Sequence, residues 1–312
     1  TASDMPIVCF TKGHGETSGE KRAIHTMFSD AGFDVREIDL SLEDIPADCR
    51  IIIADAPLYD FIGREAESES ANEIAKLDTF LDSYGCFMIF ADYEKSANLV
   101  NLNEFLEEWG ISFRSNTYLR DYDHATSVDG ITVIAEYVGT SESAPNAYQL
   151  HQTVSQTSGV RTVFRNATEL VADTGKSGKS VEVALQTSSS AKSTYGGEET
   201  TGSFPLLALS TEMNYAEDNS AQYRYVMLVA STDFANDSFL TSGYGNRRIL
   251  SSAARMMSTQ RNIPDIDYKK FEDDALTLDQ ETARNLTIFI TVFAPLIIIV
   301  IGLVVYLRRR HL

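Results

Sequence analysis

Short apolar runs alternate with helical stripes along roughly the first 115 residues. Apolar runs short enough for buried strands occur at 6–10, 33–38, 50–54 and 86–90. Between them apolar residues recur at helical spacing, as Ile24, Met27 and Ala31, then Ile74, Leu77, Leu81 and Tyr84, then Leu99, Leu102, Leu106 and Trp109. This alternation predicts an α/β fold built on a doubly wound, mainly parallel sheet.

A glycine follows each of these predicted helices: Gly32, Gly85 and Gly110. Glycine enters the left-handed conformation without the steric cost that other residues meet, and it is enriched just past helix ends for that reason. We therefore expect all three glycines to be left-handed before the next strand begins.

The pattern weakens between 115 and 203. Short β-like runs lie at 131–138, 160–164 and 181–185, separated by polar segments. The segment 188–203 is rich in Ser, Thr and Gly, which predicts a mobile surface loop. Regular structure returns at 205–210 and 225–230, which we expect to be closing strands of the same sheet, and a helix is predicted over 246–258.

The chain ends with an uncharged apolar stretch at 286–307, followed at once by Arg308, Arg309 and Arg310. At about 1.5 Å per residue it spans roughly 33 Å, which matches a hydrocarbon core of about 30 Å. A removable lipid-anchor tail would lack the arginines, and a cell-wall sorting tail needs an LPxTG-like sequence that 262–284 does not contain. We therefore expect a transmembrane helix, with the arginines in the cytoplasm and the bulk of the chain on the other side.

These features divide the chain into parts. We predict an extracytoplasmic α/β domain at 1–260 whose 115–203 part is less regular and β-rich, a juxtamembrane connector at 261–284, a transmembrane helix at 285–307 and a cytoplasmic basic tail at 308–312. Because the chain begins with Thr1 directly before a strand, we expect a fragment whose upstream part is missing.

The chain is strongly acidic, with 26 Lys and Arg against 45 Asp and Glu and a formal net charge of −19. Such a charge argues against nucleic acid as a partner and against docking on anionic lipid. The three cysteines, Cys9, Cys49 and Cys86, cannot all pair within one chain, and each lies in or at the start of an apolar run. They are predicted to be buried free thiols.

Ligands of open parallel sheets collect at the carboxyl ends of the strands, so the loops there form the candidate site. These loops carry Lys12, Gly13, His14, Gly15 and Glu16 after the first strand, Asp55 after the third, Asp92 after the fourth, and Asp233 and Asn236 near the end. We expect His14, Glu16, Asp55, Asp92 and Asp233 to converge on one rim.

Two interpretations of this rim stay open. A histidine with several carboxylates suits a divalent metal or a polar ligand. Alternatively, Gly13 and Gly15 form a tight turn, while His14, Glu16 and Asp233 cap helices and cross-link loops. No ligand spacing here is diagnostic of a metal site, and we predict neither a metal nor a cofactor.

Sequence signatures of catalysis are missing. No G-x-S-x-G or G-x-C-x-G elbow is present, and the cysteines lie within a strand or at strand beginnings, opposite the crevice. The segment GKSGKS at 175–180 resembles a phosphate loop, but Asp173 stands where that motif needs its first glycine. These observations favour a protein without enzymatic activity.

Several segments together resemble a known family. They are TKGHGE at 11–16, IIIADAP at 51–57, YGCFMIFAD at 84–92, VALQTS at 183–188, and VASTDFAN at 229–236 followed by Asn246. With the final apolar helix and its arginines, they resemble the auxiliary extracytoplasmic proteins of gliding-motility-type ABC transporters, in order along nearly the whole chain. The chain departs from that family at Cys86, where a second glycine is common.

The resemblance implies a class I glutamine amidotransferase-like fold without the nucleophile, and the family usually carries an upstream membrane helix. It also implies a bacterial cytoplasmic membrane protein whose partners are an ABC permease and its ATPase, with the bilayer contacted through Leu286–Leu307. Its rim, with Asn236 and Asn246, then binds a partner or substrate. Two alternatives remain: a membrane-tethered hydrolase or metal-dependent enzyme that uses His14, Glu16 and Asp233, and an extracytoplasmic module that senses a sugar or peptide.

Overall fold

A computed structural model describes residues 5–16, 23–65, 72–95, 98–215, 219–258 and 291. The chain divides into two compact units, Thr1–Ile263 and Pro264–Leu312, and the description below concerns the first unit.

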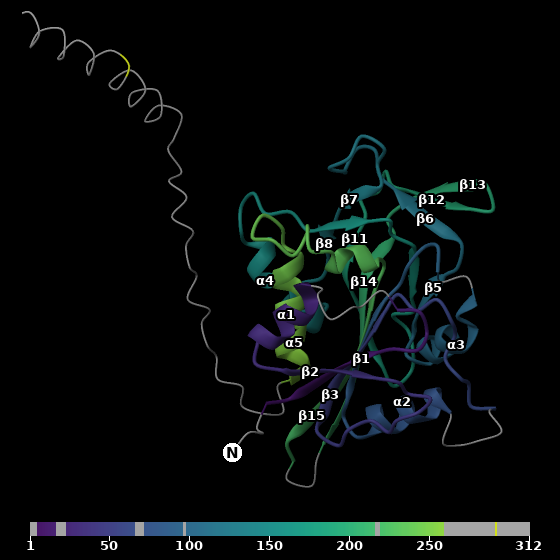
Figure 1. The fold of residues 1–312 in the computed structure, drawn as a ribbon. Helices are drawn as coiled ribbons and strands as arrows, with labels where there is room; N and C mark the ends of the chain where they lie inside the picture. The colour runs from purple at the N-terminus through teal and green to yellow at the C-terminus, as the bar shows by residue number, and fades with distance from the viewer. Residues whose placement is uncertain are drawn as a thin grey trace, which may run out of the picture. The chain divides into compact units, whose positions relative to one another are not determined.

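A mixed central sheet forms the core of this unit (Figure 1). Within the described residues its order is β2 (Asp34–Ile38), β1 (Ile7–Thr11), β3 (Cys49–Asp55), β4 (Cys86–Phe90), β15 (Ala221–Val229), β14 (Pro205–Tyr215), β11 (Ser180–Gln186) and β8 (Glu136–Tyr137). The pairings from β2 to β15 are parallel, and those from β15 to β8 are antiparallel. The α/β class and the large, mainly parallel sheet agree with the sequence prediction. Both segments expected to close the sheet belong to it, as the hairpin β14–β15.

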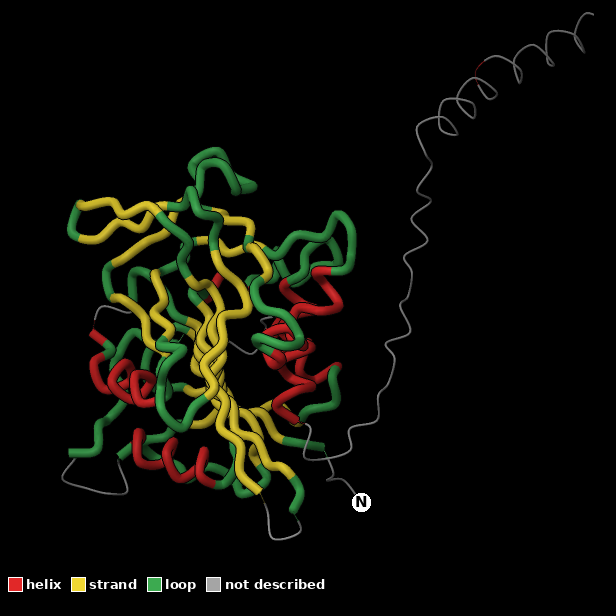
Figure 2. Tube along the Cα trace, turned by 180° about the vertical axis from the view of Figure 1, so that it is seen from behind, coloured by secondary structure: helices red, strands yellow, loops and turns green. Residues whose placement is uncertain are grey.

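Helices cover both faces of the sheet. They are α1 (Ala23–Asp30), α2 (Glu73–Asp82), α3 (Val100–Glu108), α4 (Pro145–Ser155) and α5 (Asn246–Ser258), with a short 3-10 helix η3 (Thr232–Ala235). Helices α1, α4 and α5 lie on one side and α2 and α3 on the other, as Figures 1 and 2 both show. The helices predicted from apolar stripes, α1, α2 and α3, are confirmed, as is the helix predicted over 246–258, α5, whereas α4 was not predicted.

The described residues also form smaller, separate sheets. They are β5 (Ile111–Arg114) with β10 (Glu169–Ala172), β7 (Thr132–Ile134) with β9 (Val163–Arg165), and β6 (Thr117–Arg120) with β12 (Lys192–Tyr195) and β13 (Glu198–Thr201). The prediction of a mobile loop at 188–203 was therefore wrong. Gly196 and Gly197 both have positive φ, which is the requirement of a two-residue hairpin turn, and β12 pairs with β6 on its other edge.

The prediction for the glycines after the helices was partly wrong. Gly32 and Gly110 are left-handed, with φ of +86° and +75°. After α2, however, Tyr84 takes the left-handed conformation, with φ of +62°. Gly85 has another role, because a Cβ at that position would lie 2.4 Å from the ring of Phe80. The ring of Phe80 packs on the chain where only a glycine leaves room for it.

The last turn of α5 is bound to the amino-terminal edge of the sheet. Arg50, near the start of β3, donates from Nε to the carbonyl oxygen of Met257 at 2.9 Å and from its guanidinium to that of Tyr223 at 3.3 Å. The thiol of Cys86, at the start of β4, donates to the same Met257 oxygen at 3.6 Å. Cys9, Cys49 and Cys86 are all buried and free.

The predicted membrane helix at 285–307 lies, apart from residue 291, outside the described residues, as do the connector at 261–284 and the tail at 308–312. None of the helices that the structure describes combines the length and the apolar character needed to cross a bilayer.

Candidate partner-binding rim

The loop after β1 turns sharply at the carboxyl edge of the sheet. Gly13 and Gly15 have φ of +107° and +74°, which other residues reach only with strain. A Cβ on Gly13 would lie 3.2 Å from a carboxylate oxygen of Asp39. The side chain of Lys12 is exposed, while its N–H donates to the carbonyl oxygen of Ile38 at 2.9 Å. This turn carries His14 back into the protein.

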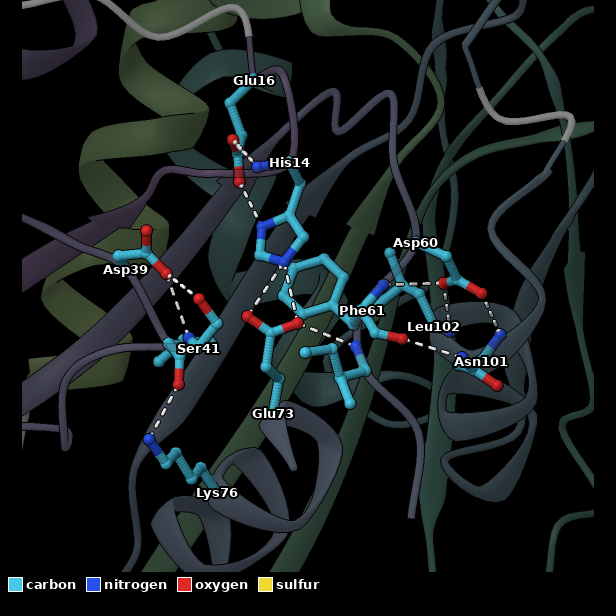
Figure 3. A network of polar contacts seen from close by, with 12 residues as sticks. His14, Glu16, Asp39, Ser41, Asp60, Phe61, Glu73, Lys76, Asn101 and Leu102 are labelled. Carbon is cyan, nitrogen blue, oxygen red and sulfur yellow. Dashed lines mark hydrogen bonds and ion pairs between the residues drawn. The ribbon is translucent and has the colours of Figure 1, made fainter. Parts of the chain in front are cut away.

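His14 lies between two carboxylates (Figure 3). Its Nδ1 is 2.9 Å from Oε1 of Glu16, and its Nε2 is 3.0 and 2.9 Å from the two carboxylate oxygens of Glu73. The backbone N–H of His14 also donates to Oε2 of Glu16 at 2.8 Å. The side chains of His14, Glu16 and Glu73 are only 7%, 3% and 1% exposed. The three residues thus form a buried, charge-assisted triad.

The charge of this triad is set by its hydrogen bonds. Burial alone lowers the pKa of His14, but the hydrogen bonds and charges of Glu16 and Glu73 outweigh it and raise the pKa to about 9. Burial by itself raises the pKa of Glu16, but the hydrogen bonds from His14, the backbone and Thr11, together with the charge of His14, outweigh burial and lower the pKa. At neutral pH the ring is therefore an imidazolium whose two N–H groups both donate to carboxylates. In this state His14 has no lone pair to offer a metal or to accept a substrate proton.

The triad also fixes the loop between β3 and α2. The ring of Phe61 stacks on the ring of His14, with centroids 4.1 Å apart and planes at 11°. The N–H of Ile62 donates to Oε2 of Glu73 at 2.8 Å. The carbonyl oxygen of His14 accepts from the N–H groups of Leu58 and Tyr59 at 2.7 and 2.8 Å. The rim therefore consists of two loops that hold each other in place.

The same loop is bound to α3. The carboxylate of Asp60 accepts from the backbone N–H groups of Asn101 and Leu102 at 2.7 and 3.1 Å, which satisfies free donors of the first turn of α3 (Figure 3). The side chain of Asn101 donates to the carbonyl oxygen of Phe61 at 2.8 Å. Loop and helix are thus joined in both directions.

The remaining acidic candidates bind other partners. Asp55 is fully buried, and its Oδ1 accepts from the hydroxyl of Thr232 at 2.6 Å, which ties the end of β3 to η3. Oδ2 of Asp233 accepts from the side chain of Asn166 at 2.8 Å. Oδ1 of Asp92 accepts from two N–H groups of the following turn, those of Glu94 and Lys95.

The two asparagines of the predicted site serve the backbone. Oδ1 of Asn236 accepts from the N–H of Ser238 at 3.0 Å. Asn246 is fully buried, and its amide bonds both backbone groups of Val163 and the carbonyl oxygen of Phe234. Asn236 thus satisfies a donor of its own turn, while Asn246 joins the start of α5 to β9 and η3.

The structure brings together some of the predicted site residues. His14 and Glu16 form a hydrogen bond, as expected. Asp55 accepts a hydrogen bond from Thr232, which directly precedes Asp233 in the chain. The described residues contain no group of three or more His, Cys, Asp or Glu arranged to hold a metal ion. The observed contacts are those of the second interpretation, in which these side chains cross-link loops.

Sequence reasoning missed Glu73, the second carboxylate of the triad. Glu73 is the first residue of α2 and follows Asn72, whose side chain caps the helix by accepting from the N–H of Ala75 at 2.9 Å. An acidic residue in a first helical turn is usually explained by the helix dipole. The segment before it, 65–72, is rich in Glu and Ser, so its sequence surroundings did not mark this carboxylate as buried.

Comparison with known proteins shows a likeness of fold only. Neither a protein-family model nor a curated protein matches the chain. Among solved structures, the "mmIFT52 N-terminal domain" is 14% identical with a TM-score of 0.56, covering 82% of this chain and 99% of that one. "Cytoplasmic Protein STM3548 from Salmonella typhimurium" (11% identity, TM-score 0.43, 81% and 98% covered) and PurLQS from Thermotoga maritima (12%, 0.41, 81% and 99%) are more distant. The described α/β unit is thus similar in fold to the first of these structures.

Proposed function

We propose that the chain is a noncatalytic auxiliary subunit of a bacterial ABC transport system. In this proposal the α/β domain lies outside the cytoplasmic membrane and binds a partner beside the permease, while the apolar segment 285–307 tethers it. The in-order resemblance of the sequence segments to gliding-motility-type auxiliary proteins supports this assignment.

The protonation and hydrogen bonding of His14 are the observation that supports a noncatalytic role. A general base needs a ring nitrogen with a free lone pair, and a pKa near the working pH makes it efficient. Here both nitrogens are bound to carboxylates and the pKa is raised to about 9. The charged side chains that a catalytic site would need are thus engaged in hydrogen bonds that hold two loops together. Such an arrangement is compatible with a rigid binding module. The alternative of a hydrolase that uses His14 and Asp233 has less support for this reason.

The test is copurification of the full chain, extracted in mild detergent from its own cells. We expect a permease and an ATPase to be recovered with it in constant proportion through a second, orthogonal column. A single-pass membrane protein with the same tag, expressed to the same level, should recover neither. Recovery of the chain without both subunits would contradict the proposal.

A further inference from the structure

The rim displays large apolar side chains to solvent on adjoining loops. The exposed fractions are 42% for Leu58, 64% for Tyr59 and 38% for Ile62 in the loop after β3, and 79% for Leu42 in the turn after β2. Single exposed apolar residues are ordinary, whereas a group of them on neighbouring loops indicates an interaction surface. These four residues are called the rim patch below.

The rim patch is held firmly from beneath. Leu58 and Tyr59 donate their N–H groups to the carbonyl oxygen of His14, whose ring is bound to Glu16 and Glu73. A Cβ on Gly15 would lie 3.1 Å from Cβ of Leu58, so the loop after β1 packs directly against Leu58. A surface fixed in this way loses little conformational entropy when it binds.

The exposed charged residues of the rim loops are mostly carboxylates. Among the described residues of these loops and of the neighbouring loop after β4, Glu43, Asp44, Glu65 and Glu94 are exposed, and Asp44 is paired with Lys76 at 3.4 Å. In the described part of the same loops the exposed cations are Lys12 and Arg64, and Arg64 is already paired with Asp78 and Glu108. Exposed apolar side chains on loops that also expose carboxylates are complementary to a partner that is apolar on one face and basic on another.

We propose that the rim patch docks a basic amphipathic helix of a protein partner. The apolar stripe of that helix covers Leu58 and Tyr59, and its Lys and Arg side chains face the exposed carboxylates of the rim loops. The proposal rests on the proposed function, because an auxiliary subunit acts through the surface that its partner binds. Exposed Tyr59 is the expected anchor, since tyrosine contributes large contact area at low entropic cost.

The test uses the full chain in phosphatidylcholine nanodiscs and a fluorescent synthetic helix with Leu on one face and Lys on the other. Anisotropy is measured at 150 mM salt against empty discs. We expect the double variant Leu58→Ser, Tyr59→Ser to bind about tenfold more weakly than the wild type. Tyr215→Ser is the matched control, because Tyr215 is 66% exposed on the hairpin β14–β15, and we expect its affinity to be unchanged.

Two outcomes would overturn the docking site. One is equal binding by the wild type and the double variant while thermal melting shows both to be folded. The other is equal binding of a peptide with the same composition but without an apolar face, since charge alone would then explain the affinity. Copurification separates this result from the proposed function: permease and ATPase recovered with the double variant would remove the rim patch as the docking site and leave the subunit role intact.

Discussion

A single buried histidine determines how the rim is held and how it responds to pH. His14 binds Glu16 and Glu73 through its ring, Phe61 through its face, and Leu58 and Tyr59 through its carbonyl group. A buried charge is tolerated here because each of its N–H groups has a charged acceptor. Removal of the ring would leave two buried carboxylates that repel each other.

We predict that His14 makes the protein less stable at alkaline pH. The folded pKa of about 9 lies above the unfolded value of about 6.5, so the folded state binds more protons in between. The contribution of His14 is fully present below about pH 6.5 and is lost as pH rises through about 9; the full shift corresponds to about 3 kcal/mol. Urea unfolding of the full chain in detergent, compared with His14→Gln between pH 6 and 10, measures this difference.

The control for this prediction lies within the same molecule. His151 is also buried, but it donates from Nε2 to the carbonyl oxygen of Val138, and burial lowers its pKa. In an NMR titration His14 should stay protonated until about pH 9, while His151 should lose its proton below about pH 6.5. An alkaline loss of stability that persists in His14→Gln would refute the assignment to this residue.

Individual contacts of the site also show which parts of it could not be predicted from the sequence. The pairing of His14 with Glu16 follows from two residues of separation on one tight turn. The partner Glu73 is 59 positions from His14, and no local pattern indicates that a helix start will turn its first side chain inward. Asp55 ends β3 and Asp233 lies in η3, soon after β15, but the hydroxyl and amide groups that engage them come from segments that only the fold brings near.

At the scale of elements, buried strands and striped helices were predictable because periodicity reports burial directly. Helix α4 was not predicted because His151 interrupts its apolar stripe. The buried face of this helix consists of His151 together with Ala147, Leu150 and Val154. The hairpin of β12 and β13 escaped because its strands are mostly Ser, Thr and Glu residues, so no alternation of apolar and polar positions marked them. The sequence feature that could have indicated this hairpin is the dipeptide Gly196–Gly197 at its turn.

We predict that Gly85→Ala is strongly destabilising although Gly85 is not left-handed. The added methyl group would lie 2.4 Å from the Phe80 ring, and overpacking of this kind costs about 1–3 kcal/mol. Gly243→Ala is the matched control, since a methyl group added there would meet no atom within 4 Å, and it should change the unfolding free energy by less than about 0.5 kcal/mol. Urea unfolding of the full chain measures both.

The cause of the destabilisation can be checked by compensation. In a Phe80→Leu background the smaller side chain makes room, so Gly85→Ala should cost less than it does in the wild type. An equal cost in both backgrounds would show that backbone freedom, rather than the Phe80 contact, is what Gly85 supplies.

At the scale of the whole molecule, the sequence prediction of membrane topology is directly testable. If the arginines after 307 are cytoplasmic, a cysteine introduced as Arg308→Cys should resist an impermeant maleimide in intact cells and react after permeabilisation. The native cysteines are buried, so they give a low background in the folded protein. Asp44→Cys, at an exposed position of the α/β domain, is the control and should react in intact cells. Labelling of position 308 alone in intact cells would reverse the topology.

The attachment of α5 to the sheet has a mechanical consequence. The carbonyl oxygen of Met257 is held by Arg50 of β3 and by Cys86 of β4, and Arg50 also binds Tyr223 of β15. Tension applied to the chain just after Ser258 is therefore shared among three central strands instead of peeling α5 away turn by turn. A force that pulls at this point therefore acts on the buried strands of the central sheet.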